Sequence, residues 1–170
     1  NLEYFFSPRS VAVIGASGRR GSIGYTLLRN FTRGGFKGRV YAVNPKHKKV
    51  QGQKSYASVS EIPAGVDMAV IAVPAPAVPQ VFRECAEKRI KAVIIISAGF
   101  SEIGEKTITK KLQELIDAYP NTRVVGPNCI GVAVPKNHLD TSFFEESRMR
   151  RPKHGAVSFL SQSGAMGAAI

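Results

Sequence analysis

The sequence predicts an α/β fold in which a doubly wound parallel sheet carries helices on both faces. Three observations predict it: short apolar runs rich in Val, Ile and Ala recur along the chain, amphipathic helical patterns separate them, and Gly, Pro, Ser or Asn follows each run. Strands that are apolar throughout are typical of a parallel sheet covered on both faces. Right-handed crossovers then bring the carboxyl ends of the strands to one edge, where ligands bind in such folds.

The first strand is expected at residues 11–14, where the sequence is Val-Ala-Val-Ile. A loop containing several glycines follows, and Ser22 is placed to cap a helix whose apolar residues recur at helical spacing. Gly34-Gly35 ends that helix. The second strand is expected at 40–43, where Asn-Pro closes it and a basic loop, 46–49, comes next.

The later elements continue this alternation. Strands are expected at 68–73, 92–96 and 123–125, followed respectively by Pro74-Ala75-Pro76, Ser97-Ala98-Gly99 and Gly126-Pro127-Asn128-Cys129. Two helices between them are predicted from apolar residues at helical spacing: Val78, Val81, Phe82 and Cys85 in one, and Ile108, Leu112, Leu115 and Ile116 in the other. Ser101 is expected to cap the second of these helices, with Glu102 and Glu105 complementing the helix dipole.

A second domain is expected near the end of the sequence. Residues 1–145 would form the first domain, a Rossmann-like α/β unit, and 146–154 a basic linker. The apolar run at 156–160 is expected to be another strand, followed by a Ser-Gly turn and small residues that begin a helix. This order repeats that of the first strand, loop and helix. Residues 155–170 are therefore expected to begin a second, flavodoxin-like α/β domain that the sequence contains only in part.

The chain is strongly basic, with 24 Lys and Arg against 12 Asp and Glu and a formal net charge of +12. This balance indicates an anionic partner, a lysine-rich surface, or a piece of a protein whose acidic remainder is missing. The sequence matches no nucleic-acid-binding module, and no apolar run reaches the length of a membrane span. Cys85 and Cys129 form no metal or disulfide pattern, so a cytoplasmic protein is expected.

The loop after the first strand has the features of an anion site. Glycines stand at positions 15, 18 and 21, and a helix begins directly after them. Such a loop presents free backbone N–H groups and the positive end of the helix dipole, which suit a phosphate or pyrophosphate. The spacing differs from the dinucleotide fingerprint G-x-G-x-x-G, because Ala16-Ser17 replaces the single residue between the first two glycines. Arg19 and Arg20 add positive charge.

The end of the second strand narrows the choice of ligand. A plain nicotinamide or flavin dinucleotide needs an Asp or Glu there to bind the ribose, and this chain has Asn44-Pro45-Lys46 instead. A basic residue at this place suits a ribose that carries a phosphate. Both NADP and coenzyme A (CoA) meet that condition, with Arg19, Arg20 and Lys46 as counter-charges.

Six strand-end motifs in order give the chain a resemblance to a known family. They are Gly-Ala-Ser-Gly (15–18), Val-Asn-Pro-Lys (43–46), Val-Pro-Ala-Pro (73–76), Ser-Ala-Gly-Phe (97–100), Gly-Pro-Asn-Cys (126–129) and Ser-Gln-Ser-Gly (161–164). With them the whole chain resembles the NDP-forming acyl-CoA synthetases. This family includes ADP-forming acetate–CoA ligase and is similar to the succinyl-CoA synthetase α subunit.

The resemblance implies a CoA-binding domain and assigns residues to it. The implied cofactor-binding residues are Gly15, Ser17, Gly18, Arg19 and Arg20 around the phosphates, Pro45 and Lys46 after the second strand, Val73 and Pro74 against the cofactor, and Ile96, Ser97 and Ala98 near the pantetheine arm. Ser161, Gln162, Ser163 and Gly164 match the helix N-terminus that in the family faces a phosphohistidine, in agreement with the anion-binding property of helix N-termini.

The resemblance also implies an ADP-forming acid–CoA ligase reaction. In that reaction acid, CoA and ATP give acyl-CoA, ADP and phosphate, reversibly, through an acyl phosphate and a phosphohistidine. His47, His138 and His154 match no phosphohistidine motif, so we expect no catalytic residue and no metal ligand in these 170 residues. They are expected to bind CoA without turnover, and possible oligomerisation is left open. The implied partners are CoA, a small carboxylic acid, and an ATP-grasp subunit or domain that binds ATP or ADP with Mg²⁺.

Two other functions remain open from the sequence. The chain could be a CoA-binding regulatory module, such as the synthetase-like part of a protein fused to an acetyltransferase. It could also be a domain of an NADP-dependent oxidoreductase, since that class shares the fold and the need for positive charge at the second strand.

Overall fold

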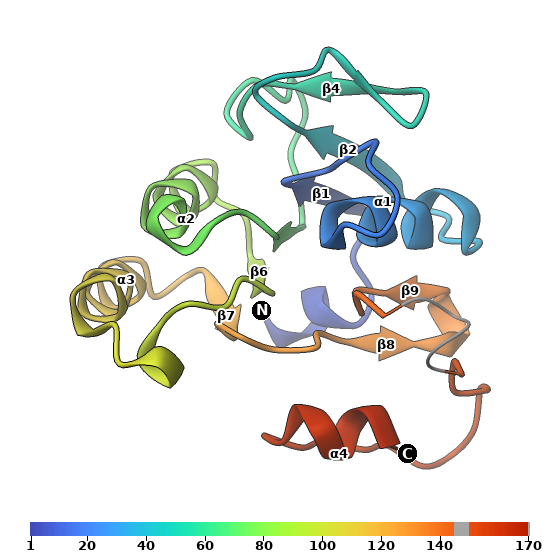
Figure 1. Ribbon diagram of the computed structural model, residues 1–170. Coiled ribbons are helices and arrows are strands. Elements are labelled where there is room, and N and C mark those ends of the chain that lie inside the picture. Colours follow the sequence, from blue (N-terminus) through green and yellow to red (C-terminus); the bar gives the residue numbers. More distant parts are fainter. Residues whose placement is uncertain (145–149, 170) are drawn as a thin grey trace.

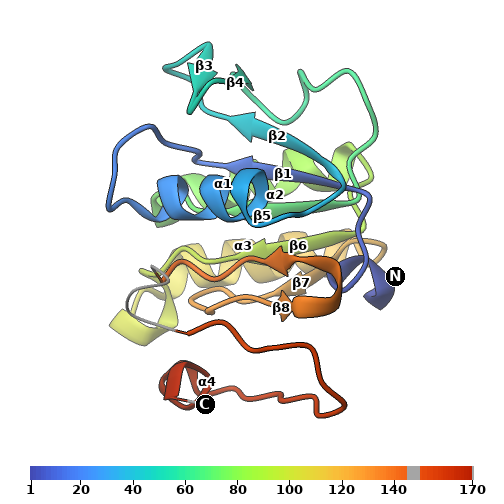
Figure 2. The same ribbon diagram turned by 90° about the vertical axis from the view of Figure 1, so that its right-hand side faces the viewer.

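The computed structural model describes residues 1–144 and 150–169 and contains the sheet that the sequence predicts. Its seven strands are β1 (Ser10–Ile14), β2 (Arg39–Val43), β3 (Lys49–Val50), β4 (Gln53–Tyr56), β5 (Met68–Ile71), β6 (Ala92–Ile95) and β7 (Arg123–Val125). They lie in the order β3-β4-β2-β1-β5-β6-β7, and within this sheet only the β3–β4 pair is antiparallel (Figures 1 and 2). The predicted parallel α/β sheet is confirmed.

Helices cover both faces of the sheet. On one side, α2 (Val78–Glu87) and α3 (Lys106–Ala118) share one apolar cluster with Ala12 and Ile14 of β1. On the other side, α1 (Ile23–Arg33) packs against Val11 and Val13 of the same strand (Figure 1). All five β1 residues are buried, as expected for a strand covered on both faces.

The α1 face has further cover from two other segments of the chain. A 3-10 helix (Leu2–Phe5) and a small hairpin of β8 (Ala133–Val134) and β9 (Leu139–Asp140) complete this layer. Phe5 and Leu139 are almost fully buried in the same apolar cluster as the α1 side chains. The N-terminal segment and the chain after β7 therefore belong to the same packed unit as the sheet.

Several local expectations are corrected. The strands expected at 68–73 and 92–96 end at residues 71 and 95. The segment expected only as a basic loop leads into the β3–β4 hairpin, whose turn places Gln51 and Gly52 at φ of 51° and 79°. Ser101 does not cap α3. Glu105 caps it instead, because its carboxylate accepts hydrogen bonds from the N–H groups of Thr107 (2.8 Å) and Ile108 (3.2 Å).

The strand expected at 156–160 is not formed. These residues pair with no strand in the described chain, and Val157 and Leu160 are 92% and 98% exposed. An apolar run becomes a strand only where a neighbouring strand takes its N–H and C=O groups. The helix expected after it is present as α4 (Gly164–Ala169). Residues 146–149 of the expected linker lie outside the described residues.

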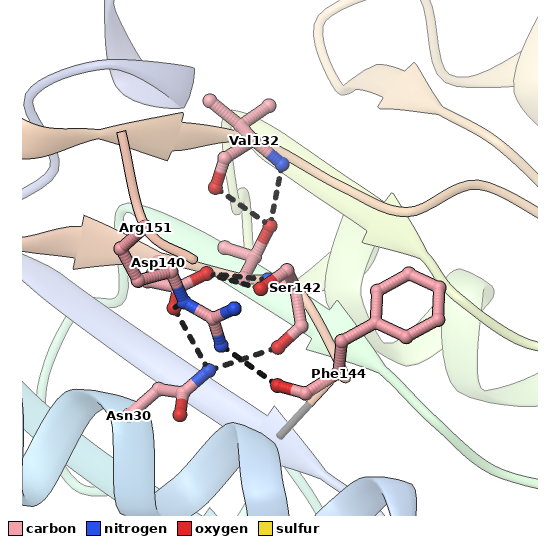
Figure 3. Close-up of polar contacts among 7 residues, drawn as sticks. Asn30, Val132, Asp140, Ser142, Phe144 and Arg151 are labelled. Carbon is pink, nitrogen blue, oxygen red and sulfur yellow. Dashed lines mark hydrogen bonds and ion pairs between the residues drawn. The ribbon is translucent and has the colours of Figure 1, made fainter. Parts of the chain in front are cut away.

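A polar cluster connects Arg151 to the β8–β9 hairpin (Figure 3). Asp140 accepts from Arg151 Nε at 2.5 Å and from Asn30 Nδ2 at 3.1 Å. Its second oxygen accepts from the N–H and hydroxyl of Ser142 at 2.9 and 2.6 Å. Arg151 also donates to the Phe144 carbonyl. The expected linker therefore contains at least one residue, Arg151, that is anchored to Asp140 of β9, which also accepts from Asn30 of α1.

No helix in residues 1–144 or 150–169 is both long and apolar enough to cross a membrane.

Candidate functional site

The loop from Gly15 to Ser22 lies where the strand order changes direction. β2 pairs with one side of β1, and β5, which comes later in the sequence, pairs with the other side. Doubly wound sheets bind their ligands at the carboxyl end of such a switch point. The register aligns Ile14 with Val43 and Ile71, so the strand ends are level. The loop after β1 projects from this carboxyl edge of the sheet (Figure 2).

Glycine is required at the first position of this loop. Gly15 has φ of 91°, and a Cβ added to it would lie 2.2 Å from the Ala72 carbonyl oxygen after β5. Gly24, in the first turn of α1, is required for a different reason: a Cβ there would lie 1.9 Å from the Gly15 oxygen. The loop and the helix are therefore in direct backbone contact. The sequence does not predict this role of Gly24, although a glycine inside a helix, where it is unfavourable, is a signal of close packing.

The start of α1 is capped as predicted. Ser22 Oγ accepts from the Tyr25 N–H at 3.3 Å and donates to the Arg19 carbonyl at 2.7 Å. Ser17 Oγ accepts from the Arg19 N–H at 3.0 Å, which closes a small turn. These bonds give the loop a defined shape without using most of its backbone donors.

Several of those donors are free. Within the described chain, the backbone N–H groups of four loop residues have no acceptor, and neither have the first two N–H groups of α1; the residues are Ser17, Gly18, Arg20, Gly21, Ile23 and Gly24. Free N–H groups beside the positive end of a helix dipole bind anions. The predicted anion site has the required donors.

Positive side chains surround the same edge. Arg19, Arg20 and Lys46 are all exposed, and in the part of the chain that the structure describes no carboxylate lies within 4.0 Å of their charged groups. Lys46 follows Pro45, and its N–H donates to the Asn44 side-chain oxygen at 2.8 Å. Within residues 1–144 and 150–169 no carboxylate compensates these charges, which suits a phosphorylated ligand.

Two carboxamide side chains, which the sequence does not single out for this role, fix the loop. Asn44 Nδ2 donates to the Ala16 carbonyl at 2.8 Å. Gln51 Nε2 donates to the Ser17 carbonyl at 2.9 Å and to the Tyr25 carbonyl at 3.0 Å. The sequence could have indicated Asn44, because it directly follows a predicted strand. It could not have indicated Gln51, because only the β3–β4 hairpin brings this residue to the loop.

The remaining predicted residues lie at the ends of β5 and β6. Ser97 is buried, and its hydroxyl donates to the Val73 carbonyl at 2.6 Å, so it joins the two strand ends. Ile96 is buried below it. Pro74 and Ala98 are exposed at the edge. Ile96 and Ser97 therefore support the site from within the fold, whereas Pro74 and Ala98 offer surface to a ligand.

The segment 161–164 lies apart from this loop. Ser161 Oγ accepts from the Ser163 N–H at 3.0 Å, and Ser163 Oγ accepts from the Met166 N–H at 3.4 Å. Both ribbon views draw α4 well away from the loop after β1 (Figures 1 and 2). The structure therefore places the two predicted anion-facing helix starts in different parts of the molecule.

Cys129 has the environment of a packed residue. Its Sγ lies 3.4 Å from the Ile95 carbonyl oxygen, and burial raises the pKa of the thiol to about 11. Nucleophilic cysteines need the thiolate near neutral pH. Cys129 is therefore not suited to be a nucleophile.

Comparison with known proteins identifies relatives of this domain. Residues 9–135 match the family model described as CoA binding domain. The α subunit of acetate–CoA ligase [ADP-forming] II from Pyrococcus furiosus is 45% identical over 99% of this chain, which spans 36% of that protein. The 4-hydroxybutyrate–CoA ligase [ADP-forming] of Nitrosopumilus maritimus is 44% identical over 96% of this chain and 23% of its own length.

A solved structure supports the same relation. The dinucleotide-forming acetyl-coenzyme A synthetase 1 of Ca. Korarchaeum cryptofilum, in complex with phosphate and ADP, superposes with a TM-score of 0.89 and 38% identity. The match covers 99% of this chain and 35% of that one. The chain thus spans between a fifth and two fifths of the length of these relatives.

Proposed function

Because the chain belongs to the CoA binding domain family, we propose that its loop from Gly15 to Ser22 binds the phosphates of CoA. The observation that carries the proposal is the set of loop N–H groups that have no acceptor among the described residues, beside three cations, Arg19, Arg20 and Lys46, that pair with no described carboxylate. An extended polyanion such as the pyrophosphate and 3′-phosphate of CoA uses both features.

The parts of CoA are assigned by chemistry. Ser17 and Gly18 offer free N–H groups to the pyrophosphate, where Gly18 has no side chain to obstruct it, and Gly15 allows the turn that presents them. Lys46, after Pro45, and the two arginines offer charge to the 3′-phosphate. The pantetheine arm follows the edge formed by Val73, Pro74 and Ala98, over the buried Ile96 and Ser97.

We further propose that the chain is the CoA-binding portion of an ADP-forming acid–CoA ligase. Its reaction joins a small carboxylic acid to CoA through an acyl phosphate and a phosphohistidine, with ATP converted to ADP and phosphate. The relatives are named for acetate and for 4-hydroxybutyrate, so the acid is not assigned. In this proposal the described residues bind CoA, and the phosphoryl transfer takes place on other parts of the enzyme.

The rest of the organisation is proposed on the same resemblance. Residues 155–170 begin a second domain, supported by the exposed apolar side chains of Val157 and Leu160, and Ser161, Gln162, Ser163 and Gly164 face the phosphohistidine there. An ATP-grasp subunit or domain is the partner that binds ATP or ADP with Mg²⁺, in line with the relative named as an α subunit. The enzyme acts in the cytoplasm.

The 3′-phosphate contact is tested by calorimetry with CoA and dephospho-CoA. Lys46→Ala or Arg20→Ala should reduce the preference for CoA over dephospho-CoA by roughly tenfold, the effect of losing about 1.4 kcal/mol. Lys37→Ala removes another exposed lysine, which precedes β2 at the opposite edge of the sheet, and should leave the preference unchanged. An unchanged preference in both site variants would show that these side chains do not bind the 3′-phosphate.

A further inference from the structure

Gln51 connects the β3–β4 hairpin to the loop after β1. It occupies the turn of the hairpin with φ of 51°, beside Gly52, and its side chain is half-buried. The Nε2 atom donates both to the Ser17 carbonyl (2.9 Å) and to the Tyr25 carbonyl (3.0 Å). One amide group therefore joins the middle of the loop to the first turn of α1.

Asn44 makes the matching contact one residue earlier, to the Ala16 carbonyl at 2.8 Å. Two consecutive loop carbonyls are thus bound to carboxamide donors. In a trans peptide the N–H points away from the carbonyl of the same unit. The N–H groups of Ser17 and Gly18, which belong to these two peptide units, therefore point away from Asn44 and Gln51, and neither has an acceptor in the described chain.

We propose that Gln51 is a positioning residue for the loop from Gly15 to Ser22, which we call the phosphate loop. It acts through Ser17 and touches no ligand atom in this proposal, which rests on the function proposed above. The loop residues from Gly18 to Gly21 are exposed, so few packing contacts hold their conformation. Without Gln51 the loop adopts its binding conformation for only a fraction of the time, and the apparent Kd rises by the inverse of that fraction.

The test compares Gln51→Met with Gln53→Met in the 170-residue chain. Methionine has a similar length and no N–H donor, and Gln53 is an exposed residue of β4 whose side chain makes no hydrogen bond within the described residues. Gln51→Met should raise the Kd of CoA and of dephospho-CoA by the same factor, roughly tenfold, which equals about 1.4 kcal/mol. The ratio of the two affinities should stay unchanged, in contrast to Lys46→Ala. Gln53→Met should alter neither affinity.

Amide hydrogen exchange without ligand supplies a second readout. In Gln51→Met the N–H groups of Ala16 and Arg19, which are bonded to Val43 and Ser17, should exchange faster, whereas amides of β6 should not change. Unchanged exchange in the loop, or a Kd equal to that of the parent chain, would overturn the role of Gln51. If the parent chain binds no CoA, the proposed function fails, and the exchange experiment still decides whether Gln51 orders the loop.

Discussion

Gly18→Ala in the phosphate loop should weaken CoA binding without destabilising the fold. A Cβ at this position meets no heavy atom within 4 Å, and Gly18 does not have the positive φ that would strain an alanine. Replacing such a glycine restricts the unfolded chain and stabilises the fold by about 0.4–1 kcal/mol. The free protein should therefore be as stable as the parent or slightly more so.

The bound state should respond in the opposite direction. The added methyl group occupies space that the pyrophosphate needs to reach the loop N–H groups. Loss of one hydrogen bond to a charged phosphate costs about 1.5–3 kcal/mol, which corresponds to a rise in Kd of roughly 10- to 150-fold. Calorimetry with CoA measures the affinity, and thermal unfolding without ligand measures the stability.

A matched variant, Gly65→Ala, provides the control. Gly65 is also exposed, a Cβ added to it likewise meets no heavy atom within 4 Å, and it precedes β5 at the opposite edge of the sheet. It should leave CoA affinity unchanged. An unaltered CoA affinity in Gly18→Ala would refute the assignment of the loop as the pyrophosphate site.

Three further predictions concern packing, the polar cluster and pH. Gly24→Ala should force α1 away from the loop, because the Cβ would lie 1.9 Å from the Gly15 oxygen; thermal unfolding should show a loss of about 1–3 kcal/mol, and a parent-like melting temperature would contradict the contact. Asp140→Ala leaves Arg151 and Asn30 without their shared acceptor and should cost roughly 2–3 kcal/mol, whereas Asp117→Ala, at an exposed site of α3, should cost little. Burial raises the pKa of Cys129 from 9.0 to about 11, so the stability that the protonated thiol contributes is complete below pH 9 and falls as the pH approaches 11; Cys129→Ala should flatten this part of the stability profile, and an equal slope in both proteins would count against it.

The central strands could be predicted because their own residues, without any distant contact, have the pattern of buried strands. Val11 to Ile14 form an apolar run that suits a strand covered on both faces, and the glycines after it mark the loop. The cap at Ser22 is likewise a local pattern, a serine directly before an amphipathic helix. Each of these features depends on residues within a few positions.

The β3–β4 hairpin and the role of Gln51 depend on contacts between distant segments. The hairpin consists largely of Lys and Gln, which have no strand pattern, and it is stabilised by the parallel pairing of β4 with β2. Nothing near Gln51 in sequence indicates that its amide reaches Ser17, 34 positions away. The sequence could therefore predict the glycines and the charged residues of the candidate site, but not the side chains that bond to the loop backbone.

The errors near α3 and at 156–160 have two different causes. Ser101 and Glu105 are both able to cap a helix. In the structure Ser101 belongs to a short 3-10 helix (Ser101–Ile103) that ends at Gly104, which has φ of 80°, so α3 begins only after Glu105. The run at 156–160 has the composition of a strand, but strand formation needs a partner, which composition does not supply.

The central claim, that this edge of the sheet binds CoA, is tested most directly by calorimetry of the 170-residue chain with CoA, dephospho-CoA and NADPH. We expect CoA to bind, dephospho-CoA to bind more weakly because it lacks the 3′-phosphate, and NADPH not to bind detectably. Binding of NADPH without binding of CoA would contradict the account and would make the chain a nicotinamide-dinucleotide domain.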